Sequence, residues 1–578
     1  MIDDRDTLNR LAHLFPLPDG GFEDVRRRRD RKRRRARLAS ATLALVLTMA
    51  LIGGFLVLLR AEREAVPTTI TPETVSELDV AWSGDLRGNA GSTLRHGSTQ
   101  RITRPAVSGD TVFGLSHGAN VSGFSSVCGS GGATCERLWS AYPVGGSPYL
   151  LHHPPVAAEG HLFVGTGLEL GGSLTAFPEH CTVGDEACES DWYATLPGWP
   201  TSSPVVSDGL VVVQVHWVDG PGYVLAFDAD CGSGGERCAP RWMVLLDDTH
   251  DVDRKAWQVL QETTFAPTVA DGVVYAVDLR DDLYAIDARN GFILWKGPAT
   301  GGDLRAGLDV EPAVADGKVL VSVGSPLHAY PVACGTDGDL CEEAWVAEPD
   351  VVGRDVRMSA PVVADGVAYI TTDPDPNSST SEGILSAYPM DCAEGCVPRW
   401  TASVGSRSGR PIVADGNVYV TSFLEGATVP TVAAFAAACA TSVCEPRWLG
   451  ELATPDIAGE PQWQDPVTSG GLVFVATLDR LLAFDAGCVP GVDARCDPLW
   501  SWTEPNGASL SAPVIDGDRL FVLATSGALY AFTPEDRSTA RTEPEVPTSG
   551  GRGGLYAAIA IIGAIGVSAA IWARRRRT

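Results

Sequence analysis

The sequence predicts an all-β protein, a β-propeller of four-stranded blades. Three observations predict this fold class: one sequence phrase recurs nine times, each copy has the alternation and turns of short strands, and eight copies close on a tryptophan. The copies start 45 to 63 residues apart, a spacing typical of solenoids and propellers. We expect eight to nine blades, and nine by the repeat count.

Each copy opens on a proline, two small or β-branched residues and a tight turn. In PVVADGVAYITT, which starts at Pro361, apolar residues flank Asp365 and Gly366. An Asp-Gly pair is a strong hairpin signal because both turn positions need positive φ. We therefore expect two antiparallel strands at each opening, followed by a third strand such as LYAID from Leu283. The nine opening prolines are Pro105, Pro155, Pro204, Pro267, Pro312, Pro361, Pro411, Pro466 and Pro513.

A tryptophan marks the fourth strand of each blade. We expect these rings to pack between adjacent blades, because a large ring buries well there. The ninth copy lacks a closing tryptophan, and Trp82 near the start lacks an opening phrase. The Trp82 strand is therefore expected to complete the last blade and remove a free sheet edge. The expected blade-packing residues are Trp82, Trp139, Trp192, Trp242, Trp295, Trp345, Trp400, Trp448 and Trp500.

Two segments resemble a known repeat family. Residues 271–296, DGVVYAVDLRDDLYAIDARNGFILWK, resemble the pyrroloquinoline-quinone (PQQ) repeat, and residues 70–82, ITPETVSELDVAW, resemble the first strand of quinoprotein dehydrogenases. The resemblance covers about residues 70–534. It implies a propeller, usually of eight blades in this family, whereas the repeat count here gives nine.

The resemblance does not imply catalysis. Quinoprotein alcohol dehydrogenases hold PQQ beneath a disulfide between adjacent cysteines and use an Asp base with a Glu and an Asn on calcium. This sequence has neither an adjacent cysteine pair nor a CxxCH haem motif. The resemblance therefore points to non-catalytic relatives, such as the outer-membrane assembly lipoprotein that uses its propeller as a protein-binding scaffold. We expect no catalytic residue, no metal and no cofactor, with PQQ as the one cofactor that the family would suggest.

Fourteen cysteines form seven close pairs, each between a third strand and a tryptophan. Outside the cytoplasm an even cysteine count favours disulfides. Zinc would need four ligands at one point, whereas these pairs are spread around a ring. In the unit of residues 271–296 a tight turn takes the place of the pair. The expected disulfides are Cys128 with Cys135, Cys181 with Cys188, Cys231 with Cys238, Cys334 with Cys341, Cys392 with Cys396, Cys439 with Cys444, and Cys488 with Cys496.

The residues just before the opening prolines are candidates for ligand binding. The first strand of a propeller blade lines the central channel, so these residues are expected at the channel mouth. A mouth of mixed charge would hold a polar ligand or a partner's loop; alternatively, a wet channel mouth tolerates any polar residue. The candidate residues are Arg104, His153, Glu311, Arg410 and Asp465.

Both ends of the chain carry an uncharged apolar run beside basic residues. Residues 38–59 are 22 residues without a charge, long enough to span a bilayer, and they follow residues 26–37, with ten basic residues in twelve. Residues 555–573 are also uncharged and precede four arginines. Because basic clusters stay on the cytoplasmic side, these patterns predict a two-span protein of the cell membrane with both termini in the cytoplasm and the propeller outside it. A cleavable signal peptide is the alternative at the first run.

These boundaries define the expected organisation of the chain. Residues 61–553 contain 27 Lys and Arg against 65 Asp and Glu, a net charge of −38 that argues against a nucleic-acid partner. Residues 533–553 are rich in Pro, Thr, Glu and Gly, which is typical of a flexible linker. The expected parts are a basic segment (1–37), a transmembrane helix (38–60), the propeller (61–532), the linker (533–553), a second transmembrane helix (554–573) and a basic tail (574–578).

The sequence therefore favours a scaffold in the bacterial cell envelope that binds another envelope or extracellular protein, or a ligand. Two alternatives stay open. One is a PQQ-dependent, quinoprotein-like oxidoreductase with a divergent site. The other is a transmembrane sensor of an extracellular ligand, for which the short basic N-terminal segment is the supporting feature.

Overall fold

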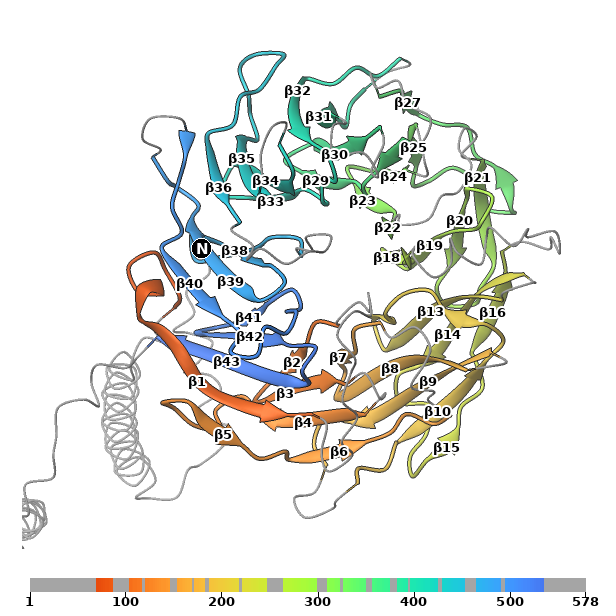
Figure 1. Ribbon diagram of the computed structural model, residues 1–578. Helices are drawn as coiled ribbons and strands as arrows, with labels where there is room; N and C mark the ends of the chain where they lie inside the picture. Colours follow the sequence, from red (N-terminus) through yellow and green to blue (C-terminus); the bar gives the residue numbers. More distant parts are fainter. Residues whose placement is uncertain are drawn as a thin grey trace, which may run out of the picture.

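The structure is a computed structural model. It describes residues 69–534 except residues 87–102, 117–119, 146–152, 169–170, 182–186, 218–220, 247–263, 299–308, 323–325, 350–355, 375–381, 393–394, 425–428, 453–463 and 490–493. This part of the chain forms nine antiparallel blade sheets arranged in a ring (Figure 1). The expected all-β propeller is confirmed, with nine blades rather than the family's usual eight. Its one helical element within the described residues is a 3-10 turn, η1 (Val75–Glu77).

In blades 1 to 8 the strands pair in chain order, in blade 9 the outer strand is β1, and the innermost strands lie nearest the centre of the ring (Figure 1). Blade 1 contains β2 (Ala106–Ser108), β3 (Thr111–Leu115), β4 (Val121–Ser125) and β6 (Trp139–Ala141); blade 2 contains β7 (Val156–Ala158), β8 (His161–Leu168), β9 (Gly171–Pro178) and β10 (Trp192–Leu196); blade 3 contains β12 (Val205–Ser207), β13 (Leu210–His216), β14 (Gly222–Asp228) and β16 (Trp242–Leu245).

The next three blades repeat this order. Blade 4 contains β18 (Thr268–Ala270), β19 (Val273–Val277), β20 (Asp282–Asp287) and β21 (Ile293–Pro298); blade 5 contains β23 (Ala313–Ala315), β24 (Lys318–Ser322), β25 (Leu327–Pro331) and β27 (Trp345–Ala347); blade 6 contains β29 (Val362–Ala364), β30 (Val367–Asp373), β31 (Gly383–Pro389) and β32 (Trp400–Gly405).

The last three blades complete the ring. Blade 7 contains β33 (Ile412–Ala414), β34 (Asn417–Ser422), β35 (Thr431–Ala436) and β36 (Trp448–Glu451); blade 8 contains β37 (Val467–Ser469), β38 (Leu472–Ala476), β39 (Arg480–Asp485) and β40 (Trp500–Thr503); blade 9 contains β41 (Val514–Asp516), β42 (Arg519–Leu523), β43 (Ala528–Pro534) and β1 (Leu78–Asp85).

Short accessory strands lie beside the blades. Two of them, β11 (Trp199–Pro200) and β28 (Arg357–Met358), extend β13 and β30, and β17 (Thr264–Phe265) pairs with β22 (Asp309–Val310). Three more, β5 (Ala133–Cys135), β15 (Glu236–Arg237) and β26 (Asp339–Leu340), each lie on the outer edge of a neighbouring blade.

The ring closes by pairing the two ends of the described chain. Strand β1 pairs antiparallel with β43, with Trp82 opposite Ala531. The expected completion of the last blade by the Trp82 strand is therefore observed. This pairing leaves β43 with a neighbour on each side and so removes a free edge.

The hairpin turns have the predicted conformation. Asp365 and Gly366 have φ values of 49° and 70°, and Ala364 lies opposite Val367 across a two-residue turn. A type I′ turn, with positive φ at both positions, matches the twist of the flanking strands, which explains the recurring Asp-Gly pairs.

The hydrophobic core is divided among the blade boundaries. Trp192 is fully buried and lies between Phe163 of its own blade and Phe227 of blade 3, at centroid distances of 6.0 Å each. Trp448 makes the same contacts with Tyr419 and Phe484, at 6.0 and 5.9 Å. Each ring thus packs one blade onto the next.

All seven predicted disulfides are present, and within the described residues no cysteine is free. We call each disulfide-closed loop a strap. The straps do more than close a hairpin, because most of them reach the outer edge of the preceding blade. In blade 3 the Cys238 N–H donates to the carbonyl of Tyr193 in blade 2, at 2.7 Å, and β15 pairs parallel with β10. The sequence did not reveal this crossing.

The membrane location predicted from the sequence needs correction. Among the residues that the structure describes, no helix is long and apolar enough to cross a bilayer, which contradicts the two-span prediction. The expected spans (38–60 and 554–573), the linker (533–553, apart from residues 533 and 534) and the terminal basic segments lie outside the described residues.

Candidate functional site

The five candidate residues lie just before the first strands of five blades. Arg104, Glu311, Arg410 and Asp465 each stand two residues before the first strand of blades 1, 5, 7 and 8, and His153 stands three residues before the first strand of blade 2. Because the first strands are equivalent, all five positions lie at the same end of the ring. We call this end the mouth.

Two of the candidates form an ion pair across the mouth. The Arg410 Nη1 atom donates to the Glu311 Oε2 atom at 2.5 Å, and the two side chains are 30% and 40% exposed. Arg410 precedes blade 7 and Glu311 precedes blade 5, so the pair passes over the start of blade 6. The sequence named both residues but carried no signal that they touch, because they are 99 positions apart.

A third candidate lies beside this pair. A Cβ atom added at Gly409 would lie 2.7 Å from the Asp465 Oδ1 atom and 2.8 Å from the Thr421 Oγ1 atom. The glycine therefore allows both oxygens to approach the backbone next to Arg410. The Thr421 hydroxyl is buried and has no hydrogen-bond partner within the described residues. Sequence reasoning missed Thr421, since it lies inside a second strand rather than before a proline.

The other two candidates lie apart from this group. His153 is half-buried, with its Nε2 atom 3.1 Å from the carbonyl oxygen of Pro200 at the start of blade 3. Arg104 is exposed. Among the five candidates, Glu311, Arg410 and Asp465 therefore form a cluster of charged residues over blades 5 to 8.

The buried Asp278 carboxyl of blade 4 has a raised pKa. Burial raises the pKa of Asp278 to about 6, although hydrogen bonds from the Asp282 and Arg280 backbone amides lower it in part. The Tyr284 hydroxyl donates to the Asp278 Oδ2 atom at 3.0 Å and also to the carbonyl of Leu246 in blade 3. Asp278 thus helps to hold blade 4 against blade 3.

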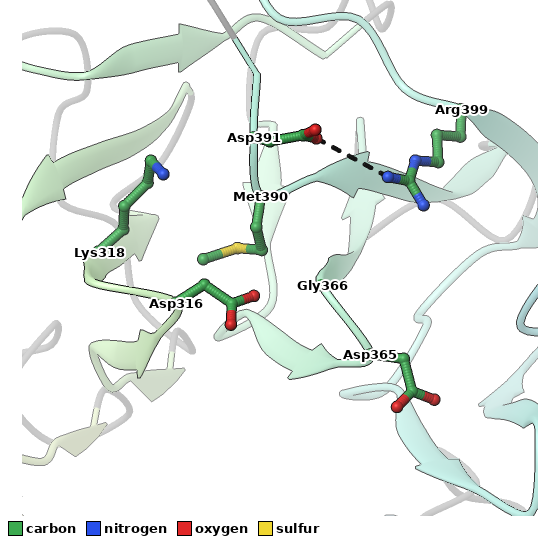
Figure 2. A pocket seen from close by; sticks show the side chains of 7 residues that line it. All are labelled: Asp316, Lys318, Asp365, Gly366, Met390, Asp391 and Arg399. Atoms are coloured by element: carbon green, nitrogen blue, oxygen red, sulfur yellow. Dashed lines mark ion pairs between the residues drawn. The ribbon is translucent and has the colours of Figure 1, made fainter.

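A separate cleft lies at the hairpin-turn end of blades 5 and 6. Figure 2 shows its charged lining, and its volume is about 310 Å³. The Arg399 Nη2 atom lies 3.8 Å from the Asp391 Oδ1 atom, and the buried Met390 belongs to the same lining. The sequence had assigned the Asp-Gly turns here only a structural role. The lining residues are Asp316, Lys318, Asp365, Gly366, Met390, Asp391 and Arg399.

Within the described residues, no group of three or more His, Cys, Asp or Glu side chains is arranged to hold a metal ion. The described cysteines are all paired within straps, so none forms the adjacent pair that the quinoprotein enzymes use.

Comparison with known proteins identifies the repeat type. Residues 254–438, from before blade 4 into blade 7, match the sequence profile of the family described as outer membrane protein assembly factor BamB. This part of the chain therefore resembles PQQ-like repeats. The chain is 27% identical to the outer membrane protein assembly factor BamB of Yersinia pestis over 22% of this chain and 43% of that protein. The alignment thus spans less than half of this relative.

The chain is also similar to solved structures of low sequence identity. BamB from Moraxella catarrhalis has 14% identity and a TM-score of 0.41, over 66% of this chain and 94% of that chain. The quinohemoprotein alcohol dehydrogenase from Comamonas testosteroni has 14% identity and a TM-score of 0.45, over 83% and 79%.

Proposed function

We propose that this PQQ-like repeat propeller is a binding scaffold that holds a charged segment of a partner protein at its mouth. The observation that carries the proposal is the Arg410–Glu311 ion pair. Both side chains are partly exposed at the mouth, and each presents hydrogen-bonding atoms to a segment that enters there. Exposed ion pairs contribute little to stability, typically about 0–1 kcal/mol, so stability alone does not explain the arrangement.

The ring itself suits this role. Straps fasten neighbouring blades at their outer edges, and β1 pairs with β43 to close the ring. A rigid ring loses little conformational entropy when a partner binds, which favours affinity. The sequence match to an outer membrane protein assembly factor supports a protein partner, and we propose an envelope protein.

The experiment compares cross-linking by the full chain and by two mouth variants, Arg410→Ala and Glu311→Ala. The full chain is expressed in its own host, a chemical cross-linker is added to intact cells, and cross-linked peptides are identified by mass spectrometry. Cross-links near residues 311 and 410 should appear with the natural chain and fall by about tenfold in either variant, because an unpaired charge then remains at the interface. The matched control is Arg399→Ala, which removes a similar exposed ion pair at the opposite end of the ring.

Two outcomes would contradict the scaffold. The first is an unchanged cross-link pattern in both mouth variants. The second is saturable binding of PQQ with calcium by the purified full chain, accompanied by dye-linked alcohol oxidation, which would make the protein an oxidoreductase.

A further inference from the structure

The outer edge of a blade is its tryptophan strand, and most of these edges are covered. A strap of the following blade pairs with β1, β10 and β21 through β5, β15 and β26, all in parallel orientation. Parallel bridges at Thr401–Val443 and Leu449–Arg495 cover β32 and β36, and the Cys188 N–H donates to Ser140 on β6. Six of the nine edges thus receive a segment from the next blade.

The edges of blades 3, 5 and 8 show no such segment among the described residues, and that of blade 3 also carries exposed apolar side chains. Among the described residues, β16 pairs with β14 and with no other strand. Blade 4, which would supply the covering segment, has the tight turn of residues 287–291 in place of a strap. A Cβ atom on Gly291 would lie 2.9 Å from three atoms of Trp242, so this turn ends directly against the tryptophan. It does not extend along β16.

The backbone of β16 has groups that face outward. The Leu246 N–H donates to Gly222 of β14, and Tyr223 lies opposite Leu245. In an antiparallel pair the bonded residues alternate, so Trp242 and Val244 bond to β14 while the N–H and C=O groups of Met243 and Leu245 point away from it.

In blade 6, Thr401 is the residue equivalent to Met243, and its outward N–H and C=O groups both form hydrogen bonds. The Thr401 N–H donates to Ser442 at 2.9 Å, and the Thr401 carbonyl accepts from the Cys444 N–H at 2.8 Å. Both partners belong to the strap of blade 7. Met243 holds the same position after its tryptophan as Thr401 does.

The outward side chains of β16 are apolar. Met243 is 53% exposed and Leu245 is 42% exposed, while the equivalent pair on β10 is Tyr193 and Thr195. Phe292, which follows the tight turn that contacts Trp242, is 70% exposed. Two partly exposed apolar side chains thus lie beside a strand edge that has no further partner strand among the described residues. This combination favours the addition of a strand.

We propose that β16 binds an extended segment of a partner protein as an added parallel strand. A backbone N–H of the segment donates to the Met243 carbonyl, and apolar side chains of the segment cover Met243 and Leu245. The parallel orientation follows from the occupied edges of the other blades. A second copy of the chain is not the occupant, because a four-residue edge is small beside the roughly 1,200–2,000 Å² of a stable interface. This inference rests on the proposed scaffold function and adds a second contact to it.

The test uses a phage library of random linear peptides selected on the full chain. The selected peptides are then measured against Met243→Pro, which removes an outward N–H that β14 does not use; proline is tolerated on the solvent side of an edge strand. Affinity should fall by about tenfold or more, because main-chain hydrogen bonds supply most of the affinity in strand addition. The matched control, Ser501→Pro, places proline at the same position of β40 and should bind the peptides as the natural chain does.

A second variant keeps the test valid if Met243→Pro unfolds. Replacing the tight turn of residues 287–291 with the strap of blade 5 covers β16 from within the chain and should abolish binding. Selected peptides that bind the strap-replaced chain undiminished would overturn the proposal, as would a selection that enriches no peptide on the natural chain.

The mouth variants separate this proposal from the scaffold function. If cross-links at the mouth depend on Arg410 while Met243→Pro and the strap replacement leave peptide binding unchanged, the edge proposal fails and the scaffold function stands. If the peptides bind β16 but no partner depends on Arg410 or Glu311, the mouth assignment fails instead.

Discussion

The indole N–H of Trp192 donates a 2.7 Å hydrogen bond to the carbonyl of Ala229, across the boundary between blades 2 and 3. Ala229 directly follows the third strand of blade 3. Six other tryptophans donate to the residue that directly follows the third strand of the next blade. These pairs are Trp82 with Ser126, Trp242 with Ala288, Trp295 with Val332, Trp345 with Met390, Trp400 with Ala437, and Trp448 with Ala486. These tryptophans therefore both pack against the next blade and donate a hydrogen bond to it.

Trp192→Phe should reduce stability more than Trp139→Phe does. Both changes replace a buried ring by a smaller ring, but the Trp139 Nε1 atom has no hydrogen-bond partner within the described residues. The Trp192 variant also leaves the Ala229 carbonyl without its partner, which should add about 1–2 kcal/mol to the cost. Urea unfolding of both variants measures the difference; equal losses would show that the hydrogen bond contributes nothing.

Replacing Cys231 and Cys238 by serine should loosen the boundary between blades 2 and 3. Opening a loop of this length should cost about 2–3 kcal/mol by the chain-entropy estimate. The Cys238 N–H, which donates to Tyr193, should exchange with deuterium faster. Hydrogen exchange followed by mass spectrometry checks this. Exchange that accelerates only inside the strap, and not in β10, would contradict a role in fastening blade 2.

Asp278→Asn should change how stability depends on pH. The pKa of Asp278 is raised from 3.8 to about 6 by burial, so the folded state binds this proton more tightly than the unfolded chain does. The resulting stabilisation is fully present below about pH 4 and is lost as the pH rises through about 6, a change of about 3 kcal/mol in the free energy of unfolding. The asparagine variant should lack this component. Urea unfolding of both proteins at about pH 4 and pH 7 gives the difference, and identical pH profiles would refute it.

Trp82→Ala should open the ring at its closure. Trp82 is 1% exposed and lies 6.0 Å from Phe124 and 6.2 Å from Phe521, measured between ring centroids. Removing the ring should cost about 3–5 kcal/mol, as for other large buried aromatic residues. Hydrogen exchange should accelerate in β1 and β43 before it does in blade 4. Uniform acceleration around the ring would mean that the β1–β43 pairing is not a separate weak point.

The candidate site was only partly predictable. The position before each opening proline led to Glu311, Arg410 and Asp465, because a repeat places equivalent residues at equivalent points of the ring. Which of them touch depends on the width of the ring and on the reach of each side chain, and no local pattern contains that information. Thr421 was missed for the same reason, since its approach to Gly409 joins neighbouring strands that the sequence separates.

The sequence alone determined the propeller, its nine repeats, the Asp-Gly hairpins, the closure by the Trp82 strand and the seven disulfides. The repeats, hairpins and disulfides depend on local alternation, turn chemistry or cysteines at most eight positions apart, and the closure follows from pairing the unmatched Trp82 strand with the incomplete ninth copy. The tertiary structure alone decided that straps cross to the preceding blade, that Arg410 meets Glu311, and that no strand among the described residues covers β16. These features follow from how blades sit side by side, because hydrogen bonds and ion pairs between blades join residues that only the closed ring brings together.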